Sequence, residues 1–572
     1  MLFPDMIDVR HKVIPYVLDA CSSLGVNWDK ISARFRREAI LSQVGRMFKE
    51  DLVGLGKANS PLDIVFVPYL GCFLGNNIVQ ITLGKILQAR GHNVKYLVCD
   101  IELPICETTD INSHNNRSEI CAYQARHMRA FFQKAGFQVI NLTELVSIER
   151  IEGLKQQLND DTWDVFVESK LIRYFKVGLL DRSHPMFGEL FDRARHAALI
   201  SAEMGKALAA LRPDRVIMSH GTYTTRGPAR ITLNEAGIKV LTISRAKMAE
   251  SQKFNWKTAG DWWDVEKEWK SVCEVPLNHQ QEALIDDYLQ SRRNHKRDIV
   301  VFNKTAEEDR AKTFAKLGLD NSKRTYTLFT NVLWDAASAQ REIAFKNPVE
   351  WTIETVKWFR HRPDKQLVVR THPAETIIGT NQPLADLIKN KLDDNIPENV
   401  VILDPDAPIN SWSLLKITDL GLVHTSTVGI ELALEGIPCV CVSKTHYREK
   451  GFTLDINSRQ EYFDLLELDE ISDFDAATAK MVAKRYSYLL FLRYQLPMPF
   501  YHPRSHIGIY SFKSTDWKEI LSSHAIPTIV KGIEEGDEFI LPDEVVYEIY
   551  RHHLNKKVDH GPDAERAITT TL

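Results

Sequence analysis

The chain has 572 residues, of which 44% are apolar and 26% charged, which is the composition of a folded protein with several domains. Its 72 basic and 76 acidic residues leave a net charge of -4. This balance excludes the basic excess that is typical of proteins whose main partner is DNA or RNA, so we expect no nucleic-acid partner.

The eight cysteines and the chain start indicate a reducing compartment. The one loose cluster, Cys99, Cys106 and Cys121, does not have the CxxC spacing of a metal site. The start MLFPDMIDVRHKV carries acids and a proline instead of a signal peptide's apolar run. The sequence contains no stretch of 18 apolar residues, so we predict no membrane span. We therefore expect a cytoplasmic protein.

Residues 1–58 are predicted to form an N-terminal helical extension. Within it, residues 31–52 show a basic amphipathic pattern, which fits a packed helix with a solvated face or a helix that docks on an anionic membrane surface. The second interpretation allows peripheral contact with the inner face of the cell membrane.

Residues 59–253 show the alternation of a Rossmann-like domain. An apolar strand (63–70), a helix (78–90) ended by Gly91, and a second strand (93–99) make a βαβ unit. The alternation continues with three further strands and one long helix, at 137–142, 215–219, 239–244 and 186–211. The pattern predicts a doubly wound parallel sheet.

Residues 254–319 are polar and rich in Trp, and are predicted to be linker helices. A second doubly wound domain is predicted over 320–470, and C-terminal helices and a tail over 471–572. The predicted strands of the second doubly wound domain are 325–330, 366–370, 400–403, 421–424 and 438–442. Its predicted helices are 348–360, 384–391 and 428–434. The fold class is therefore α/β, with two Rossmann-like domains that face a central cleft. Parallel sheets bind ligands at their carboxyl ends, so loops after strands should carry the chemistry.

The first such loop is Arg370-Thr-His372-Pro373-Ala-Glu, directly after a strand. Pro373 restricts His372 to an extended backbone. A histidine fixed there can donate a hydrogen bond to a phosphate oxygen, and Arg370 can add charge. The alternative is a loop histidine with a structural role.

The second loop is Thr425-Ser426-Thr427, which opens a predicted helix. Hydroxyl side chains favour a helix start, and the exposed amides of that start bind anions. Gly429 allows close approach, and Glu431, one turn in, can reach a pair of ribose hydroxyls. A plain capped helix explains Ser426 and Gly429 equally well.

The third loop, residues 443–453, also follows a strand and carries Lys444, His446 and Arg448. These cations can close over a phosphate or a sugar carboxylate. A solvated basic loop is the alternative.

The segments RTHPAE, HTSTVGIELALEGIPC and KTHYREKGFT resemble those of the capsule polysaccharide biosynthesis glycosyltransferases, a family that includes Kdo transferases. The His-Pro and Ser/Thr motifs are also similar to those of bacterial sialyltransferases. The resemblance implies the GT-B fold, with a nucleotide-sugar donor bound in the C-terminal domain. It implies that His372, Ser426 and Thr427 hold the donor phosphate, that no metal or other cofactor is needed, and that the donor is an acidic sugar activated by CMP. UDP- and GDP-sugars fit similar folds.

The N-terminal domain is expected to bind the acceptor and to supply the general base. Candidate catalytic residues are Glu102 and His220, which follow strands in that domain, and Asp335 in the other domain. Candidate acceptor contacts are Gly71 and Asn76, which follow the first strand, and Tyr223, which lies in the same loop as His220. His220 is the first choice for the base because a His-Gly turn at a strand end is unusual. The acidic pair followed by Gly that serves sialyltransferases has no clean match here, so the base and the stereochemistry stay open.

Together these features predict a metal-independent glycosyltransferase that moves a sugar from a nucleotide sugar to a surface polysaccharide, oligosaccharide or glycolipid acceptor. A nucleotide-sugar epimerase or a polyol-phosphate transferase with the same fold is the alternative. A non-catalytic glycan-binding partner is a further one, which the intact phosphate motifs disfavour.

Overall fold

The computed structural model describes residues 55–68, 74–107, 110–111, 129–293, 309–335, 340–503 and 510–555, together with Gly45, Met47, Phe48 and Leu52. The predicted N-terminal helical extension and the basic segment 31–52 therefore lie almost entirely outside the described residues. Within the described part of the chain, no helix is both long and apolar enough to cross a bilayer.

The first part of the chain folds around a sheet with the order β13-β6-β5-β4-β1-β2-β3. Five of these strands, β1 to β5, run parallel, and β6 and β13 are antiparallel to their neighbours. The order of the parallel strands is 3-2-1-4-5, that of a doubly wound fold. The strands are β1 (Asp63–Val67), β2 (Asn93–Val98), β3 (Gln138–Asn141), β4 (Arg215–Ser219), β5 (Lys239–Arg245), β6 (Ser251–Trp256) and β13 (Leu496–Pro497).

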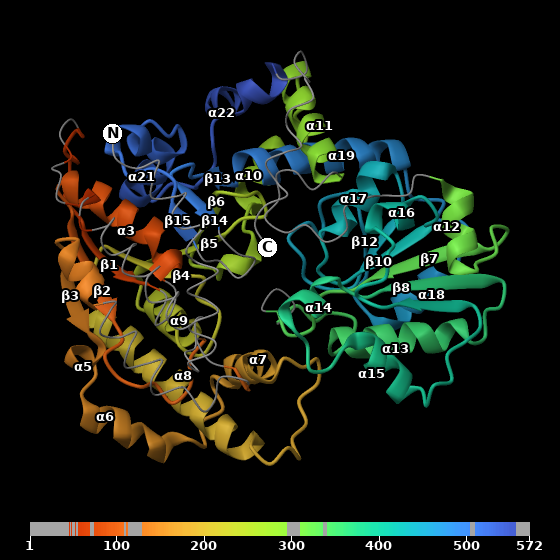
Figure 1. The fold of residues 1–572 in the computed structure, drawn as a ribbon, viewed down its shortest axis with the longest axis horizontal. Helices are drawn as coiled ribbons and strands as arrows, with labels where there is room; N and C mark the ends of the chain where they lie inside the picture. The colour runs from red at the N-terminus through yellow and green to blue at the C-terminus, as the bar shows by residue number, and fades with distance from the viewer. Residues whose placement is uncertain are drawn as a thin grey trace, which may run out of the picture.

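Helices complete this first domain (Figure 1). Strands β1 and β4 are almost wholly buried because apolar side chains cover both of their faces. The helices are α3 (Leu74–Ala89), α5 (Leu142–Leu145), α6 (Ile148–Gly153), η2 (Leu154–Gln157), α7 (Asp164–Phe175), α8 (Phe187–Ala210) and α9 (Gly227–Glu235).

The second sheet has the order β12-β11-β10-β7-β8-β9 and is wholly parallel. Its strand order repeats that of the first sheet, so β7 and β10 lie side by side where the chain changes direction across the sheet. The strands are β7 (Arg324–Phe329), β8 (Lys365–Arg370), β9 (Val400–Leu403), β10 (Leu420–Val423), β11 (Cys439–Cys441) and β12 (Leu454–Asp455).

The helices of the second domain begin and end as their sequences indicate. Asn347 caps α13 through its side chain and Pro348 occupies the first turn, and α17 ends at Gly436 in a left-handed conformation. The helices are α12 (Arg310–Leu317), α13 (Pro348–Phe359), α14 (Ala374–Ile378), α15 (Leu384–Lys391), α16 (Ser411–Leu415), α17 (Val428–Glu435) and α18 (Arg459–Glu467).

The remaining elements connect the two domains and then return to the first one. Between the sheets lie η3 (Gly260–Trp262), α10 (Glu266–Val272) and α11 (His279–Arg293). After the second sheet come α19 (Ala476–Ser487), the π-helix η5 (Tyr488–Arg493), the hairpin β14 (Tyr501–Pro503) and β15 (Tyr510–Phe512), α20 (Trp517–Leu521), α21 (Ala525–Glu535) and α22 (Asp543–Asn555).

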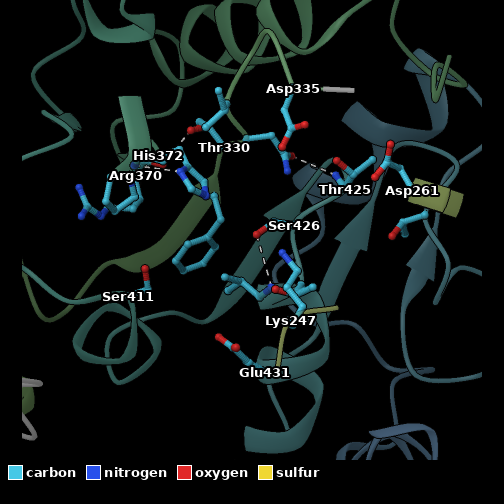
Figure 2. Close-up of a pocket in the computed structure, with 18 of the residues that line it drawn as sticks. Lys247, Asp261, Thr330, Asp335, Arg370, His372, Ser411, Thr425, Ser426 and Glu431 are labelled. Atoms are coloured by element: carbon cyan, nitrogen blue, oxygen red, sulfur yellow. Dashed lines mark hydrogen bonds between the residues drawn. The ribbon is translucent and has the colours of Figure 1, made fainter. Parts of the chain in front are cut away.

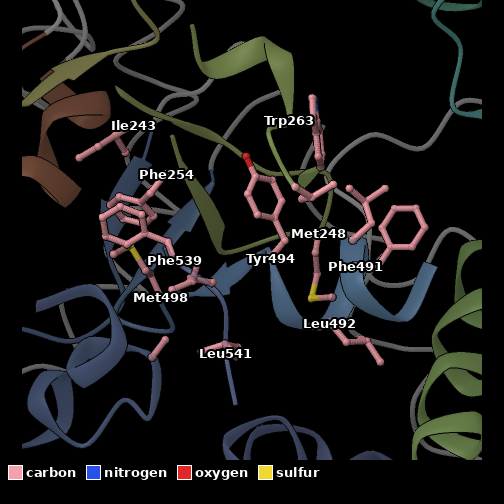
Figure 3. Packing of buried hydrophobic residues seen from close by; sticks show 14 of the residues in the cluster. Ile243, Met248, Phe254, Trp263, Phe491, Leu492, Tyr494, Met498, Phe539 and Leu541 are labelled. Carbon is pink, nitrogen blue, oxygen red and sulfur yellow. The ribbon is translucent and has the colours of Figure 1, made fainter. Parts of the chain in front are cut away.

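The C-terminal segment that returns to the first domain packs into its hydrophobic core. Phe254 on β6 stacks on Phe539, with ring centroids 5.0 Å apart, and both belong to the cluster that also contains residues of η5 (Figure 3). Arg215 on β4 donates to the carbonyl of Ile533 on α21 at 2.9 Å. The last 60 or so described residues therefore belong physically to the first domain.

The predicted fold class, two Rossmann-like sheets in an α/β protein, is confirmed. Two of the predicted boundaries are displaced. The boundary at 253/254 cuts through β6, and the predicted tail after 471 supplies β13, which pairs with β6. Neither strand shows the apolar run of a buried parallel strand, because β6 is polar and β13 has only two residues.

Candidate functional site

A pocket of about 390 Å³ lies at the carboxyl edge of the second sheet and faces the first domain (Figure 2). Residues that follow β7, β8, β10 and β11 line it, so it sits at the point where the strand order of this sheet reverses. The first domain closes it with the turn after β5 and with η3. The volume suits a small ligand.

His372 lies in the pocket wall just after β8. Its Nδ1 accepts a hydrogen bond from the backbone N–H of Ala374 at 3.1 Å, so a neutral ring carries its proton on Nε2. Burial, with Lys247 and Arg370 nearby, lowers the pKa of His372 to about 3. The ring is therefore a neutral hydrogen-bond donor at physiological pH.

The hydroxyl-rich turn before α17 forms the facing wall, with Thr425, Ser426 and Thr427 all lining the pocket. Ser426 Oγ accepts from the backbone N–H of Val428 at 3.4 Å, and the N–H of Thr425 donates to the side chain of Asn331 at 3.2 Å. The eight residues of α17 add their helix dipole. Such a helix start attracts anions.

Arg370 and Lys444 add positive charge to this side of the pocket. Arg370 is 2% exposed and donates Nη1 to the carbonyl of Asp404 at 3.0 Å. Its Nε and Nη2 have no hydrogen-bond partner among the described residues. Burial lowers the pKa of Arg370 to about 10, which leaves it charged at neutral pH. A buried and largely uncompensated cation favours an anion in the adjacent space.

The third predicted loop contributes only in part. Lys444 and His446 line the pocket, and the His446 ring stacks on Trp263 with centroids 5.4 Å apart. Burial and then Lys253 hold the pKa of His446 well below its usual value, so its ring is neutral.

Two predicted ligand contacts are corrected by the structure. Arg448 turns away from the pocket and donates to the carbonyl of Cys441 at 3.3 Å and to Asn457 Oδ1 at 2.7 Å. It therefore holds its own loop together. Gly429 gives room to a protein side chain, because a Cβ there would lie 2.5 Å from the hydroxyl of Tyr447.

The candidates from the first domain lie elsewhere. His220 does not line the pocket; its Nδ1 accepts from the N–H of Thr222 at 3.3 Å, and burial, then Arg226, lowers its pKa to about 4. Tyr223 is buried beneath the guanidinium of Arg173, and Glu102 is exposed on the loop after β2. The reason is that contacts within the first domain hold these side chains, and the carbonyl of His220 accepts from the N–H of Gly260 at 2.8 Å. Gly71 and the side chain of Asn76 lie outside the described residues.

Of the predicted catalytic residues, Asp335 lines the pocket, and a second carboxylate does so that the sequence pattern did not single out. Asp261, on η3, accepts from Thr222 Oγ1 at 3.1 Å and presents its carbonyl to Arg341 Nη2 at 2.9 Å. Arg341 also lies 3.6 Å over the Trp262 ring, so it joins the two domains beside the pocket. Only the run Gly-Asp-Trp-Trp at 260–263 marks this position in the sequence.

Cations outnumber acids in the pocket. The acidic lining residues are Asp261, Asp335 and Glu431. The cationic lining residues are Arg245, Lys247, Arg292, Arg341, Arg370 and Lys444. Among the described residues, no group of three or more His, Cys, Asp or Glu side chains is arranged to hold a metal ion. The pocket's own side chains therefore make it suitable for a phosphate-bearing or otherwise anionic ligand.

Two facing doubly wound domains with a cationic pocket at the strand-order reversal of the second define a protein of the GT-B type. Within this class, the family model described as "Capsule polysaccharide biosynthesis protein" matches residues 275–490, from the linker into η5. The matched part contains all three motif loops and confirms the resemblance inferred from them. Over that segment, the chain is similar to the capsule polysaccharide biosynthesis family.

Solved structures give more distant likenesses. A beta Kdo 2,4 transferase, KpsC of Thermosulfurimonas dismutans, aligns at 12% identity and a TM-score of 0.33, over 54% of this chain and 88% of its own. The UDP-GlcNAc 2-epimerase of Neisseria meningitidis aligns at 9% identity and a TM-score of 0.23, over 74% and 95%. No curated protein matches the chain.

Proposed function

We propose that the protein is a glycosyltransferase that transfers a sugar from a nucleotide-sugar donor to a surface or capsular polysaccharide, oligosaccharide or glycolipid acceptor. The observation that carries the proposal is the meeting, in one pocket, of His372 with the hydroxyl-rich start of α17. The match of residues 275–490 to the capsule family supports it.

In this proposal the donor phosphate lies between His372 Nε2 and the turn of Ser426 and Thr427, with Arg370 and Lys444 as nearby cations. When the bond between the sugar and the phosphate breaks, its electron pair goes to the phosphate oxygen. Preorganised donors and cations stabilise that charge without reorganisation, so these residues favour the departure of the nucleotide.

The acceptor hydroxyl must lose a proton as its oxygen bonds to the sugar. If the reaction inverts, a carboxylate takes that proton directly; if it retains, a carboxylate can act as nucleophile. Asp261 and Asp335 are the described carboxylates that face this part of the pocket, and we propose that one of them has this role in place of His220.

The proposal assigns the positive charge near the phosphate to protein side chains, so we propose that the protein needs no metal ion. A CMP-activated acidic sugar is the proposed donor. We place the reaction in the cytoplasm, and contact with the inner face of the membrane stays a prediction that depends on residues 31–52.

A thermal-shift screen with CMP-, UDP- and GDP-sugars in the presence of EDTA tests the proposal. A ligand at 100 times its Kd adds about 2.7 kcal/mol of stability, which gives a clear shift in melting temperature. We expect one nucleotide class to stabilise the wild type and His372→Ala to lose that shift. The absence of a shift with every class would reject the proposal.

Product analysis separates transfer from the rival reaction on the same fold. A transferase consumes donor only when an acceptor hydroxyl is present, apart from slow hydrolysis. Conversion of a UDP-sugar into its epimer without acceptor would identify an epimerase instead.

A further inference from the structure

Helix α11 ends in two arginines, and both contact α17, the helix whose start lines the pocket. Arg292 Nη2 donates to Glu431 Oε1 at 2.8 Å, and Arg293 pairs with Glu435 one turn further along α17. Both pairs therefore join α11 to α17. They differ in one respect, since Arg292 and Glu431 line the pocket, whereas Arg293 and Glu435 do not.

Only one of the two carboxylate oxygens of Glu431 accepts a hydrogen bond from a described residue. Its side chain is 10% exposed, and within the described part of the chain its one hydrogen bond runs from Arg292 to Oε1. The second oxygen, Oε2, accepts no hydrogen bond from the described residues, and Glu431 lines the pocket. Glu431 lies in the first turn of α17, beyond Ser426, at the end of the pocket where Ser411 also lies (Figure 2).

Arg292 is itself held firmly. Its side chain is 9% exposed, and its guanidinium lies 4.8 Å from the centroid of the Phe491 ring on η5. A planar guanidinium packed on an aromatic face has little freedom to rotate, so it fixes the orientation of the carboxylate that it binds. Without it, Glu431 would be a buried acid without a partner, which is a costly state that favours side-chain movement or protonation.

We propose that Arg292 is a positioning residue that turns Glu431 Oε2 toward a sugar hydroxyl of the bound nucleotide, which makes the pocket selective for ribonucleotides over 2′-deoxyribonucleotides. The inference rests on the proposed function, because it places the phosphate at the start of α17 and the ribose one turn along the same helix. A carboxylate accepts from the hydroxyls of a ribose and has no partner at position 2′ of a deoxyribose. An acceptor left unpaired by the deoxy analogue lowers its affinity.

The test compares the nucleotide pairs CMP and 2′-dCMP, UDP and 2′-dUDP, and GDP and 2′-dGDP, by calorimetric titration. Wild type is expected to bind the ribo form of its preferred pair on the order of 10-fold more tightly than the deoxy form. Arg292→Met is expected to bring that ratio below about 3-fold, mainly through weaker binding of the ribo form. In turnover, the variant should raise KM for the donor more than it lowers kcat.

Arg293→Met is the matched control. It also removes an ion pair between α11 and α17, so a merely structural role for Arg292 predicts the same change in both variants. We expect Arg293→Met to keep the wild-type ratio. Glu431→Gln, which keeps the side-chain shape, should lower the ratio as Arg292→Met does, and it serves if Arg292→Met does not fold.

The outcomes separate the inference from the function on which it rests. If no nucleotide binds the wild type, the proposed function fails. If the wild type binds ribo and deoxy forms equally, or if Arg292→Met and Glu431→Gln keep the wild-type ratio, the function stands and the role of Arg292 is wrong.

Discussion

The two sheets of this protein have the same strand order but use their carboxyl edges differently. At the edge of the second sheet, Arg370 lines a pocket, and its Nε and Nη2 have no hydrogen-bond partner among the described residues. At the edge of the first, Arg226 lies 3.6 Å from Glu107 with both side chains at 0% exposure. The hydroxyl of Thr225 donates to the Glu107 carboxylate, whose two oxygens lie 2.7 and 2.6 Å from Oγ1. The same topology therefore leaves nitrogens of Arg370 without a partner among the described residues at one edge and pairs Arg226 with Glu107 at the other.

The pKa of Glu107 reflects the charge pairing at the first edge. Burial acts to raise the pKa of Glu107, but Arg226 and Lys170 outweigh it and hold that pKa below its usual value. At the first edge, the buried carboxylate is therefore paired with cations inside the protein. The comparison teaches that charge at a strand-order reversal marks a ligand site only where the protein has not already paired it.

Breaking the first network should have the largest effect. Arg226→Met leaves Glu107 charged and without its main partner at full burial, so we expect a loss of about 3–5 kcal/mol in the free energy of unfolding. Denaturant unfolding measures it, with the exposed Glu102→Gln as control at less than about 0.5 kcal/mol. A loss for Arg226→Met no larger than that of the control would contradict the contrast between the two edges.

The buried histidines of the second edge should make the protein sensitive to acid. The pKa values of His372 and His424 are both lowered to about 3, chiefly by burial, so the unfolded chain binds more protons than the folded protein below about pH 6.5. Stability present above that pH is therefore lost as the pH falls toward the folded values. His372→Gln should reduce this slope by up to about 1.4 kcal/mol per pH unit between pH 6 and 4. Parallel curves for variant and wild type, from unfolding at several pH values, would refute the assignment.

Removing a cation from the second edge should affect binding more than folding. Arg370→Met gives up one hydrogen bond, to Asp404, and an otherwise uncompensated buried charge, so we expect less than about 1 kcal/mol of change in stability. Nucleotide affinity should fall about 10-fold, since the charge acts on the phosphate through a medium of low dielectric. If Arg370→Met unfolds as readily as Arg226→Met, the two edges are alike and the comparison fails.

The smallest expected effect distinguishes two cations of one loop. Lys444 is exposed at the pocket, so Lys444→Met should weaken nucleotide binding about 3-fold at low salt and less at high salt. Arg448→Met should leave the nucleotide Kd unchanged, because Arg448 binds Cys441 and Asn457. Titrations at two salt concentrations check this, and an equal loss in both variants would reopen a ligand role for Arg448.

The sequence predicted what depends on local pattern. Strands such as β4 and β9 and helix α15 have the predicted bounds, because apolar runs and turn residues mark their ends. The second-domain wall of the pocket could also be predicted from the sequence, because His372 and Ser426 follow strands whose carboxyl ends must meet at one edge.

The rest depends on how the domains meet. Asp261 and Lys247 reach the pocket only because the first domain closes over the second, and no local pattern encodes that placement. His220 follows a strand as the rule requires, yet it is buried among the polar residues of its own domain. Position at a strand end therefore does not establish that a side chain faces this site.

The most direct test of the central claim is a crystal structure of the protein with the nucleotide that gives the largest thermal shift. We predict a phosphate oxygen about 3 Å from His372 Nε2, the usual hydrogen-bond distance, and a second one at the start of α17 beside Ser426. A phosphate bound at the edge of the first sheet instead, near His220 and Arg226, would contradict the account.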